Sequence, residues 1–365
     1  MWLDRRIQDL FGIELPIIQA PMAGAVGSEM VIAVSEAGGL GSLPCAMLGP
    51  EQMRTELGII RQRTSRPINL NFFCHQPPQA KPEREVAWKR HLESYYVQLG
   101  LDPQASVPAA TRVPFDSTMC DLVEEFAPEV VSFHFGLPEP TLLERVRATG
   151  AKIISSATSA DEARWLEDQG CDAIIAQGYE AGGHRGLFLT QDITTQAGTM
   201  ALVPQVVDAV NVPVIAAGGI ADARGIAAAF ALGASAVQIG TAYLFCPEAK
   251  VNAVHRQALK SAKDNDTVLT NVFTGRPARG IINRIVREVG PMSDLAPEFP
   301  LAAGALAPLR ARAEAAGSGD FSPLWSGQAA ALGREMPAGD LTRELGMSAL
   351  TLLSRLAPAD EPLSA

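Results

Sequence analysis

Short runs of apolar residues alternate along the chain with stretches in which apolar positions recur every three or four residues. The runs have the length of strands buried on both faces of a parallel sheet, and the stretches have the period of amphipathic helices. Eight strands are predicted, at residues 16–22, 38–43, 67–73, 130–136, 152–156, 172–176, 212–216 and 236–241. Helices are predicted between them, at 28–37, 50–63, 118–126, 139–149, 160–169, 199–210 and 223–232. Eight such units with right-handed crossovers predict an α/β fold of the (β/α)8 TIM-barrel class.

Two segments depart from this alternation, and they set the expected domain organisation. Residues 77–114 contain six prolines and a charged, aromatic stretch at 83–99 that is predicted to be helical. Long loops of this kind are often lids or binding surfaces, so this insertion is expected to lie over the barrel face. We expect the barrel to occupy residues 1–246, and residues 247–365 to form a mostly helical region that packs on the barrel mouth. Within that region, helices are predicted at 251–262, 301–316, 323–334 and 339–356, with a local strand pair within 264–289.

Composition narrows the class of protein. Of the 365 residues 47% are hydrophobic and 19% are charged, which is typical of a globular α/β enzyme. The net charge of −10 and the lack of a basic stripe argue against nucleic acid or an anionic membrane as a partner. No apolar window is long enough for a membrane span, and five scattered cysteines favour a reduced, cytoplasmic protein. Whether the C-terminal region pairs two subunits in a homodimer stays open.

The candidate chemistry is concentrated in residues 176–186, a glycine-rich loop that follows the predicted strand 172–176. A single imidazole, His184, lies among Gly182, Gly183 and Gly186. Glycine amides can approach a flat or phosphorylated ligand closely, and a histidine at the carboxyl end of a barrel strand is commonly catalytic. The alternative is that His184 and Arg185 form a solvated loop pair with no catalytic role.

The other strands end in residues that the barrel would gather at the same mouth. The candidate site residues lie after the first strand and at the carboxyl ends of the third to eighth strands. They are Pro21, Met22, Ala23, Asn71, His134, Ser156, Gln177, Gly218, Gly219, Gln238, Ile239, Gly240 and Thr241. The loops after strands seven and eight are where such barrels hold a phosphate. With two amides to recognise a heterocycle edge, the set suggests flavin mononucleotide (FMN).

The remaining polar residues add little to this site. The strand ends show no Asp/His pattern for a metal, so no metal is expected. The three other histidines, His75, His91 and His255, lack a comparable setting and are interpreted as surface or loop residues.

Seven segments together resemble the class I nitronate monooxygenases, formerly called 2-nitropropane dioxygenases, within a larger group of FMN-binding TIM-barrel proteins. Ser-Phe-His-Phe-Gly at 132–136 and Glu-Ala-Gly-Gly-His-Arg-Gly at 180–186 are the most specific. The other matching segments are 19–24, 69–73, 216–220, 238–241 and 321–328. They follow the family's order across most of the chain.

The resemblance implies a role for each strand-end residue. His184 would be the catalytic base, and His134 would lie beside the substrate. FMN would contact Pro21, Met22, Ala23, Asn71, Gln177, Gly182, Gly183, Gly218, Gly219, Gln238, Ile239, Gly240 and Thr241. The implied reaction is oxidation of an alkyl nitronate by O2 to an aldehyde or ketone with nitrite, without a nicotinamide. Neutral nitroalkanes would first lose their α-proton to a base.

One segment departs from the family pattern. Phe299, Ala303 and Ala307 stand where the family commonly carries tyrosines and a lysine at the substrate entrance. Losing a cation and hydrogen-bond donors predicts weaker recognition of a small anionic tail, such as the carboxylate of propionate 3-nitronate.

Two other functions remain open from the sequence. One is an FMN-dependent NAD(P)H oxidoreductase acting on a quinone or an enoyl thioester, as in other branches of the same superfamily. The other is a non-catalytic flavin- or phosphate-binding protein, which the changed residues at 299–307 favour and an intact His184 opposes.

Overall fold

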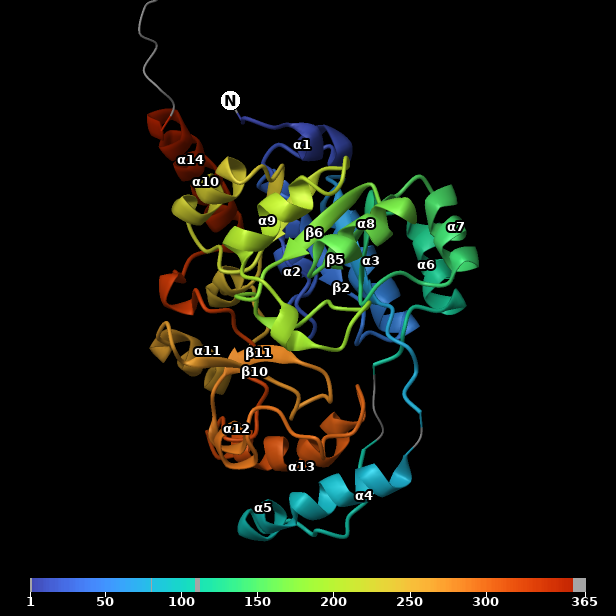
Figure 1. Ribbon diagram of the computed structural model, residues 1–365, viewed down its shortest axis with the longest axis vertical. Helices are drawn as coiled ribbons and strands as arrows, with labels where there is room; N and C mark the ends of the chain where they lie inside the picture. The colour runs from blue at the N-terminus through green and yellow to red at the C-terminus, as the bar shows by residue number, and fades with distance from the viewer. Residues whose placement is uncertain (1, 80, 109–111, 357–365) are drawn as a thin grey trace, which may run out of the picture.

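The protein is a parallel barrel with a second, smaller layer across one end (Figure 1). The computed structural model describes residues 2–79, 81–108 and 112–356. Eight parallel strands have the order β1-β9-β8-β6-β5-β4-β3-β2, and a bridge between Ile18 and Leu40 joins the two outer strands. The strands are β1 Ile17–Gln19, β2 Gly41–Pro44, β3 Ile68–Phe73, β4 Val130–His134, β5 Lys152–Ala157, β6 Ala173–Gln177, β8 Val214–Ala217 and β9 Ala236–Ile239. All eight predicted strands and the (β/α)8 class are confirmed.

Helices cover the outside of this barrel. Seven follow the predicted ranges closely: α2 Ser28–Glu36, α3 Pro50–Arg63, α6 Ser117–Phe126, α7 Pro140–Ala148, α8 Ala160–Asp168, α9 Thr199–Val207 and α10 Ala223–Ala231. Helix α1 Arg6–Phe11 closes the end where the strands begin, since Ile7 and Phe11 pack against strand residues such as Ile18 and Ile215. The ligand site must therefore open at the opposite end, where the strands finish.

The eighth position in the ring of helices is filled from far along the chain. Helix α14 Ala338–Leu356 packs between α10 and α2, and the Tyr243 hydroxyl lies 2.8 Å from Thr342 Oγ1 in its buried face. We expected this helix at the barrel mouth, and its position on the barrel wall corrects that expectation. Dividing the chain after residue 246 would separate α14 from the barrel that it completes.

A small antiparallel sheet lies across the mouth. Its order is β10-β11-β7, from β10 Thr267–Thr270, β11 Ala278–Ile281 and β7 Gly183–His184. His184 pairs with Ala278, so the glycine-rich loop after β6 is fixed by a strand of the C-terminal region. The candidate catalytic histidine is thus positioned by two segments about ninety residues apart in sequence.

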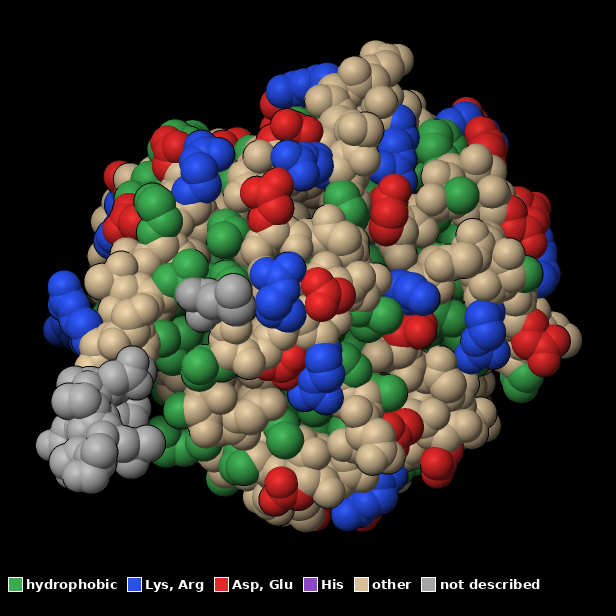
Figure 2. Space-filling view, turned by 90° about the horizontal axis from the view of Figure 1, so that it is seen from above, with side chains coloured by type: hydrophobic (Ala, Val, Ile, Leu, Met, Phe, Trp, Pro, Cys, Tyr) green, Lys and Arg blue, Asp and Glu red, His purple; other side chains and the backbone are tan. Residues whose placement is uncertain are grey.

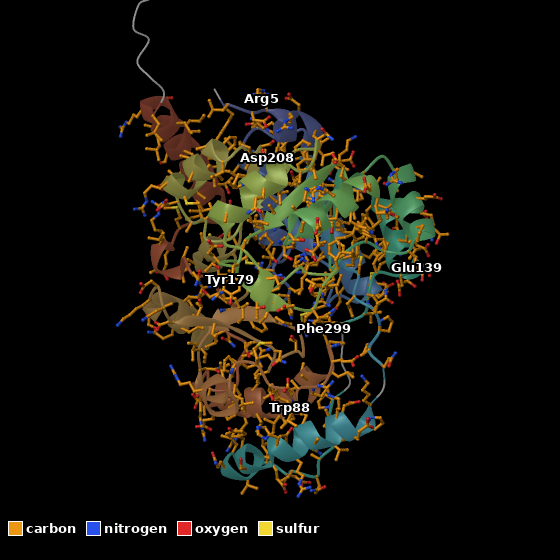
Figure 3. All side chains as sticks on the ribbon, in the orientation of Figure 1. Arg5, Trp88, Glu139, Tyr179, Asp208 and Phe299 are labelled. Carbon is orange, nitrogen blue, oxygen red and sulfur yellow. The ribbon has the colours of Figure 1, made fainter. Side chains whose placement is uncertain are left out.

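The insertion and the C-terminal region form a second core beyond this sheet, in the lower part of Figure 1. It contains α4 Pro82–His91 and α5 Glu93–Gln98 from the insertion, with α12 Arg284–Val289 and α13 Ala302–Ala315. Figure 3 shows Trp88 of α4 facing α13, where its indole donates to Ala302 O at 3.2 Å. The helix predicted at 83–99 is found as two helices, α4 and α5, which Leu92 alone separates, and Trp88, Leu92, Tyr95 and Tyr96 are buried in this core.

The helix predicted at 323–334 is also wrong. Trp325 bridges Gly280 of β11, and the side chain of Asn283 donates to Ser322 O at 2.9 Å, so this segment runs extended across the mouth. Only the turn η3 Ala330–Leu332 is helical there. The helix predicted at 251–262 corresponds to α11 Ala253–Ser261, and η2 Thr241–Phe245 follows β9 directly.

The surface carries charges of both signs. Figure 2 shows acidic and basic side chains interspersed over the end of the molecule that carries α1. In the described ranges, none of the helices is long and apolar enough to cross a membrane.

Candidate active site

A cavity of about 400 Å³ lies at the mouth, where the strands end. The loops after β1, β6, β8 and β9 line it, together with residues from the ends of β3, β4 and β5 and residues 322–327 of the C-terminal region. The sequence-predicted residues on its wall are Pro21, Met22, Ala23, Asn71, His134, Ser156, Gln177, Gly182, Gly183, His184, Gly218, Gly219, Gln238, Gly240 and Thr241. The exception is Ile239, which strand alternation turns away from Gln238 into the core between sheet and helices.

Arg185 holds the glycine-rich loop in place. Its side chain is 0% exposed and donates to Gly178 O at 2.7 Å, Gln177 O at 2.8 Å and Gln196 Oε1 at 2.6 Å. Burial lowers the pKa of its guanidinium to about 10, so it remains charged at neutral pH. The alternative of a solvated His184–Arg185 loop pair is therefore wrong. The Arg185 side chain binds Gln177 O and Gly178 O, and so it ties its own segment of the loop to the end of β6.

The hydrogen bonds of His184 determine which ring nitrogen is free. Its Nε2 lies 3.0 Å from Thr274 Oγ1, and that hydroxyl lies 3.3 Å from Arg276 O. A hydroxyl has one proton, and a carbonyl can only accept. Both contacts are satisfied when Thr274 donates to Arg276 O and accepts from the Nε2–H of His184. This arrangement leaves Nδ1 of His184 without a proton.

His134 supports the same loop from β4. Its Nε2 lies 3.2 Å from His184 O, so it donates there, and its Nδ1 accepts from Ser156 Oγ at 3.1 Å. Gln177 Nε2 also donates to His184 O, at 3.0 Å, while Gln177 Oε1 accepts from Gly186 N at 2.8 Å. The amide of Gln177, expected to recognise a ligand, is thus engaged in holding the histidine loop.

Both histidines are neutral at ordinary pH. Burial, followed by nearby cations that include Arg112 and Arg276, holds the pKa of His184 well below 6.5. Burial and Arg276 lower the pKa of His134 to about 3. A neutral imidazole with an unprotonated nitrogen facing a cavity can accept a proton at neutral pH.

The rest of the cavity suits a flat heterocycle that carries a phosphate. Gln238 Oε1 is buried and lacks a hydrogen-bond partner among the described residues, which is costly unless a ligand supplies one. Gly218 and Gly219 have φ of +119° and +71°, a region that favours glycine, and they form the turn after β8. No group of three or more metal-binding side chains occurs in the described part of the chain.

Sequence reasoning missed several residues around His184. His75 lies in the loop after β3, as one of the two expected alternatives, but it is 5% exposed and its ring contacts Phe299 edge-on at 4.8 Å between centroids, so it is not a surface residue. His255 is also not a surface residue: it lines the cavity and its Nε2 lies 3.0 Å from Trp325 O. His91 is exposed, as predicted. The position of His75 just after strand three was a usable signal.

Two arginines near His184 were also missed. Arg112, in the insertion, lines the cavity with its guanidinium carbon 5.9 Å from the Phe299 ring centroid. Arg276, between β10 and β11, lies 3.9 Å over the ring of Phe135. Phe299 itself, labelled in Figure 3, lies between the barrel and the lower helices. Nothing in the local sequence indicates that either arginine lies near the site, because their positions depend on how distant segments pack together.

Comparison with known proteins agrees with this site. A family model described as "Nitronate monooxygenase" matches residues 4–347. A nitronate monooxygenase of Pseudomonas aeruginosa is 42% identical over 343 residues, which cover 93% of this chain and 97% of the relative. Nitroalkane oxidase from Streptomyces ansochromogenes has a TM-score of 0.88 at 36% identity, covering 96% of this chain and 99% of its own. FabK from Thermotoga maritima has a TM-score of 0.73 at 31% identity, covering 96% and 97%.

The family model and the named relatives place the protein in the class of flavin-dependent oxidoreductases, and the barrel with its glycine-rich mouth agrees with that class. The chain belongs to the nitronate monooxygenase family.

Proposed function

We propose that the protein binds FMN and oxidises alkyl nitronates with O2 to an aldehyde or ketone and nitrite, and that it also accepts neutral nitroalkanes through His184 as base. The observation that carries this proposal is that His184 lines the cavity with its Nε2 3.0 Å from Thr274 Oγ1, a contact that assigns the proton to Nε2 and leaves Nδ1 to accept one. An alkyl nitronate is the anion left when a nitroalkane loses its α-proton, so a base in this position links the two substrates.

The chain's own residues would share the work as follows. Gly218 and Gly219 after β8, together with the N-terminal end of η2, would receive the FMN phosphate. Asn71 and Gln238 would face the ring system. When bound, FMN would accept electrons from the substrate. His184 Nδ1 would take the α-proton of a nitroalkane, and Thr274 would keep accepting from Nε2–H in the imidazolium formed. Neighbouring cations disfavour the positive charge of that imidazolium. The anionic nitronate formed beside it would offset this charge.

Thr274 offers a test of the base assignment. We expect Thr274→Val, which cannot accept from Nε2–H, to lower kcat/KM for a nitroalkane by about tenfold, because the imidazolium formed on proton transfer would lose a hydrogen bond. Thr274→Ser keeps the hydroxyl and should stay within about twofold of the wild type. Turnover of pre-formed nitronates, which need no base, should change little in both variants. Equal losses on nitroalkane and nitronate would indicate a packing defect instead.

Neighbouring glycines of the loop test the proposed cofactor site. A Cβ on Gly182 would lie 2.5 Å from Gly327 N, so Gly182→Ala must displace the segment that donates to Thr241 Oγ1 at 2.9 Å. We expect FMN affinity to fall by about tenfold or more, measured by quenching of flavin fluorescence. Gly183→Ala is the matched control, since its Cβ would meet no atom within 4 Å and costs only the strain of φ +71°. Greater loss of FMN in the Gly183 variant would contradict this assignment.

The reaction itself is tested by mixing the yellow protein anaerobically with an alkyl nitronate, NADH or NADPH and following the flavin spectrum. The proposal predicts that the nitronate changes the spectrum and that nitrite appears once O2 is admitted. Rapid bleaching by NADH or NADPH, without reaction of the nitronate, would instead support a nicotinamide-dependent reductase.

A further inference from the structure

Positive charge surrounds the free face of His184 without a matching carboxylate. Among the described residues that line the cavity, Glu314 is the one acidic side chain. It is already engaged, because it accepts from Arg310 Nε at 2.8 Å and Ser322 Oγ at 2.7 Å. Neither Arg112 nor Arg276 forms an ion pair with a described residue. Lys250 and Arg310, the other cations on the described wall, pair with Glu56 and Glu314, so Arg112 is the one lining cation there without a carboxylate partner among the described residues.

The nearest candidate counter-ion for Arg276 is occupied elsewhere. Glu162 is fully buried and accepts four hydrogen bonds, from Thr158 N, Thr158 Oγ1, Phe188 N and Leu189 N, at 2.6–3.2 Å. Arg276 donates to Leu187 O, but its Nε is buried without a partner. Arg276 does not line the cavity, so it contributes charge without offering its guanidinium to a ligand there.

Arg112 does line the cavity. Its side chain is half-buried, its Nε lacks a hydrogen-bond partner within the described ranges, and burial together with Arg310 lowers its pKa. A buried guanidinium without a counter-ion is costly, and an anionic ligand would relieve that cost through charge-assisted hydrogen bonds. The cation that residues 299–307 do not provide thus comes from the insertion.

We propose that Arg112 binds an anionic group of the substrate and that, where this group is the nitronate itself, Arg112 makes the cavity prefer a nitronate over its neutral nitroalkane. This inference rests on the proposed function and adds a residue to it. Arg112 and His184 would then have opposite selectivities. His184 serves the neutral form, which must lose a proton, and Arg112 serves the form that is already an anion. The group bound is either the nitronate itself or a carboxylate carried by the same molecule.

The kinetic test compares Arg112→Gln, Arg112→Lys and a matched control on the same insertion, Arg90→Gln, which changes an exposed arginine of α4. The substrates are neutral 1-nitropropane, its nitronate, and the nitronate of 3-nitropropanoate. We expect Arg112→Gln to raise KM for a nitronate by about tenfold or more, and KM for neutral 1-nitropropane by less than about threefold. Arg112→Lys should recover part of the loss, and Arg90→Gln should match the wild type.

The two nitronates identify the group that Arg112 binds. Equal rises in KM for both would assign it to the nitronate group, and a rise for the carboxylated one alone would assign it to the carboxylate. The inference is overturned if KM for both anions is unchanged, or if neutral 1-nitropropane suffers equally, since a general packing defect would do that.

A binding measurement keeps this inference separate from the proposed reaction. Propanoate or nitrate is titrated into the flavin-loaded protein, and the shift in flavin absorbance gives Kd. The wild type should bind one or both of these anions about tenfold more tightly than Arg112→Gln. This result would stand even if no nitronate were oxidised, in which case the proposed function would fail and the anion site would not. Equal Kd values in both proteins would contradict the role of Arg112.

Discussion

Turnover of neutral nitroalkanes is expected to fall by about 10²–10⁴-fold when His184 is replaced by asparagine, the range typical of a lost general base. Asparagine is similar in size and polar, but its amide cannot take a proton at neutral pH. Pre-formed nitronates need no deprotonation, so their turnover should fall much less. The measurement is nitrite release from 1-nitropropane and from its nitronate, each corrected for bound flavin.

The loss must be specific to the base step to support this role. His91→Asn, which changes an exposed histidine of α4, is the control and should match the wild type. If the His184 variant kept its nitroalkane activity, another group would have to be the base. If both substrates were lost together, His184 would be needed for binding rather than for proton removal.

Stability is expected to fall steeply as the pH drops below about 6.5. Burial is the main cause that lowers the pKa of His75 to about 4 and of His134 to about 3, and it holds the pKa of His184 well below 6.5. In the unfolded chain each imidazole titrates near 6.5, so below that pH the unfolded state binds more protons than the folded state. Each histidine then removes about 1.4 kcal/mol of unfolding free energy per pH unit, or about 4 kcal/mol per unit for all three.

Urea unfolding between pH 6.5 and 4.5 isolates this effect. Carboxylates with lowered pKa values, such as Glu56 and Glu314, contribute at lower pH, because their ordinary pKa is 4.5. His75→Phe should reduce the slope of unfolding free energy against pH by about 1.4 kcal/mol per unit. An unaltered slope in the His75 variant would mean that this imidazole becomes protonated in the folded protein.

The barrel was predictable because its strands and helices carry their own signal. The run at 212–216 is apolar on both faces, and the helix at 50–63 was predicted with both ends correct. The strand-end rule then placed His134, His184 and the glycines at one mouth without any knowledge of contacts. The prediction that Ile239 lines the mouth was wrong only because consecutive strand residues face opposite sides.

The rest depends on contacts between distant segments, which local patterns do not encode. The extended course of 322–328 follows from its pairing with β11. Arg112 reaches the cavity because the insertion packs on a core built from the C-terminal region. His75 carried a strand-end signal, but its aromatic surroundings come from Phe135 and Phe299, far along the chain.

The position of α14 has a consequence for the order of assembly during translation. Residues 338–356 leave the ribosome after β10, β11 and α13, so the segments that cover the mouth are made before the helix that fills the gap between α10 and α2. Until then, the surfaces of α10 and α2 that α14 covers in the folded protein, among them core residues, lack this helix. A chaperone that shields exposed hydrophobic surface would therefore be expected to engage the nascent chain there and to be displaced when α14 arrives.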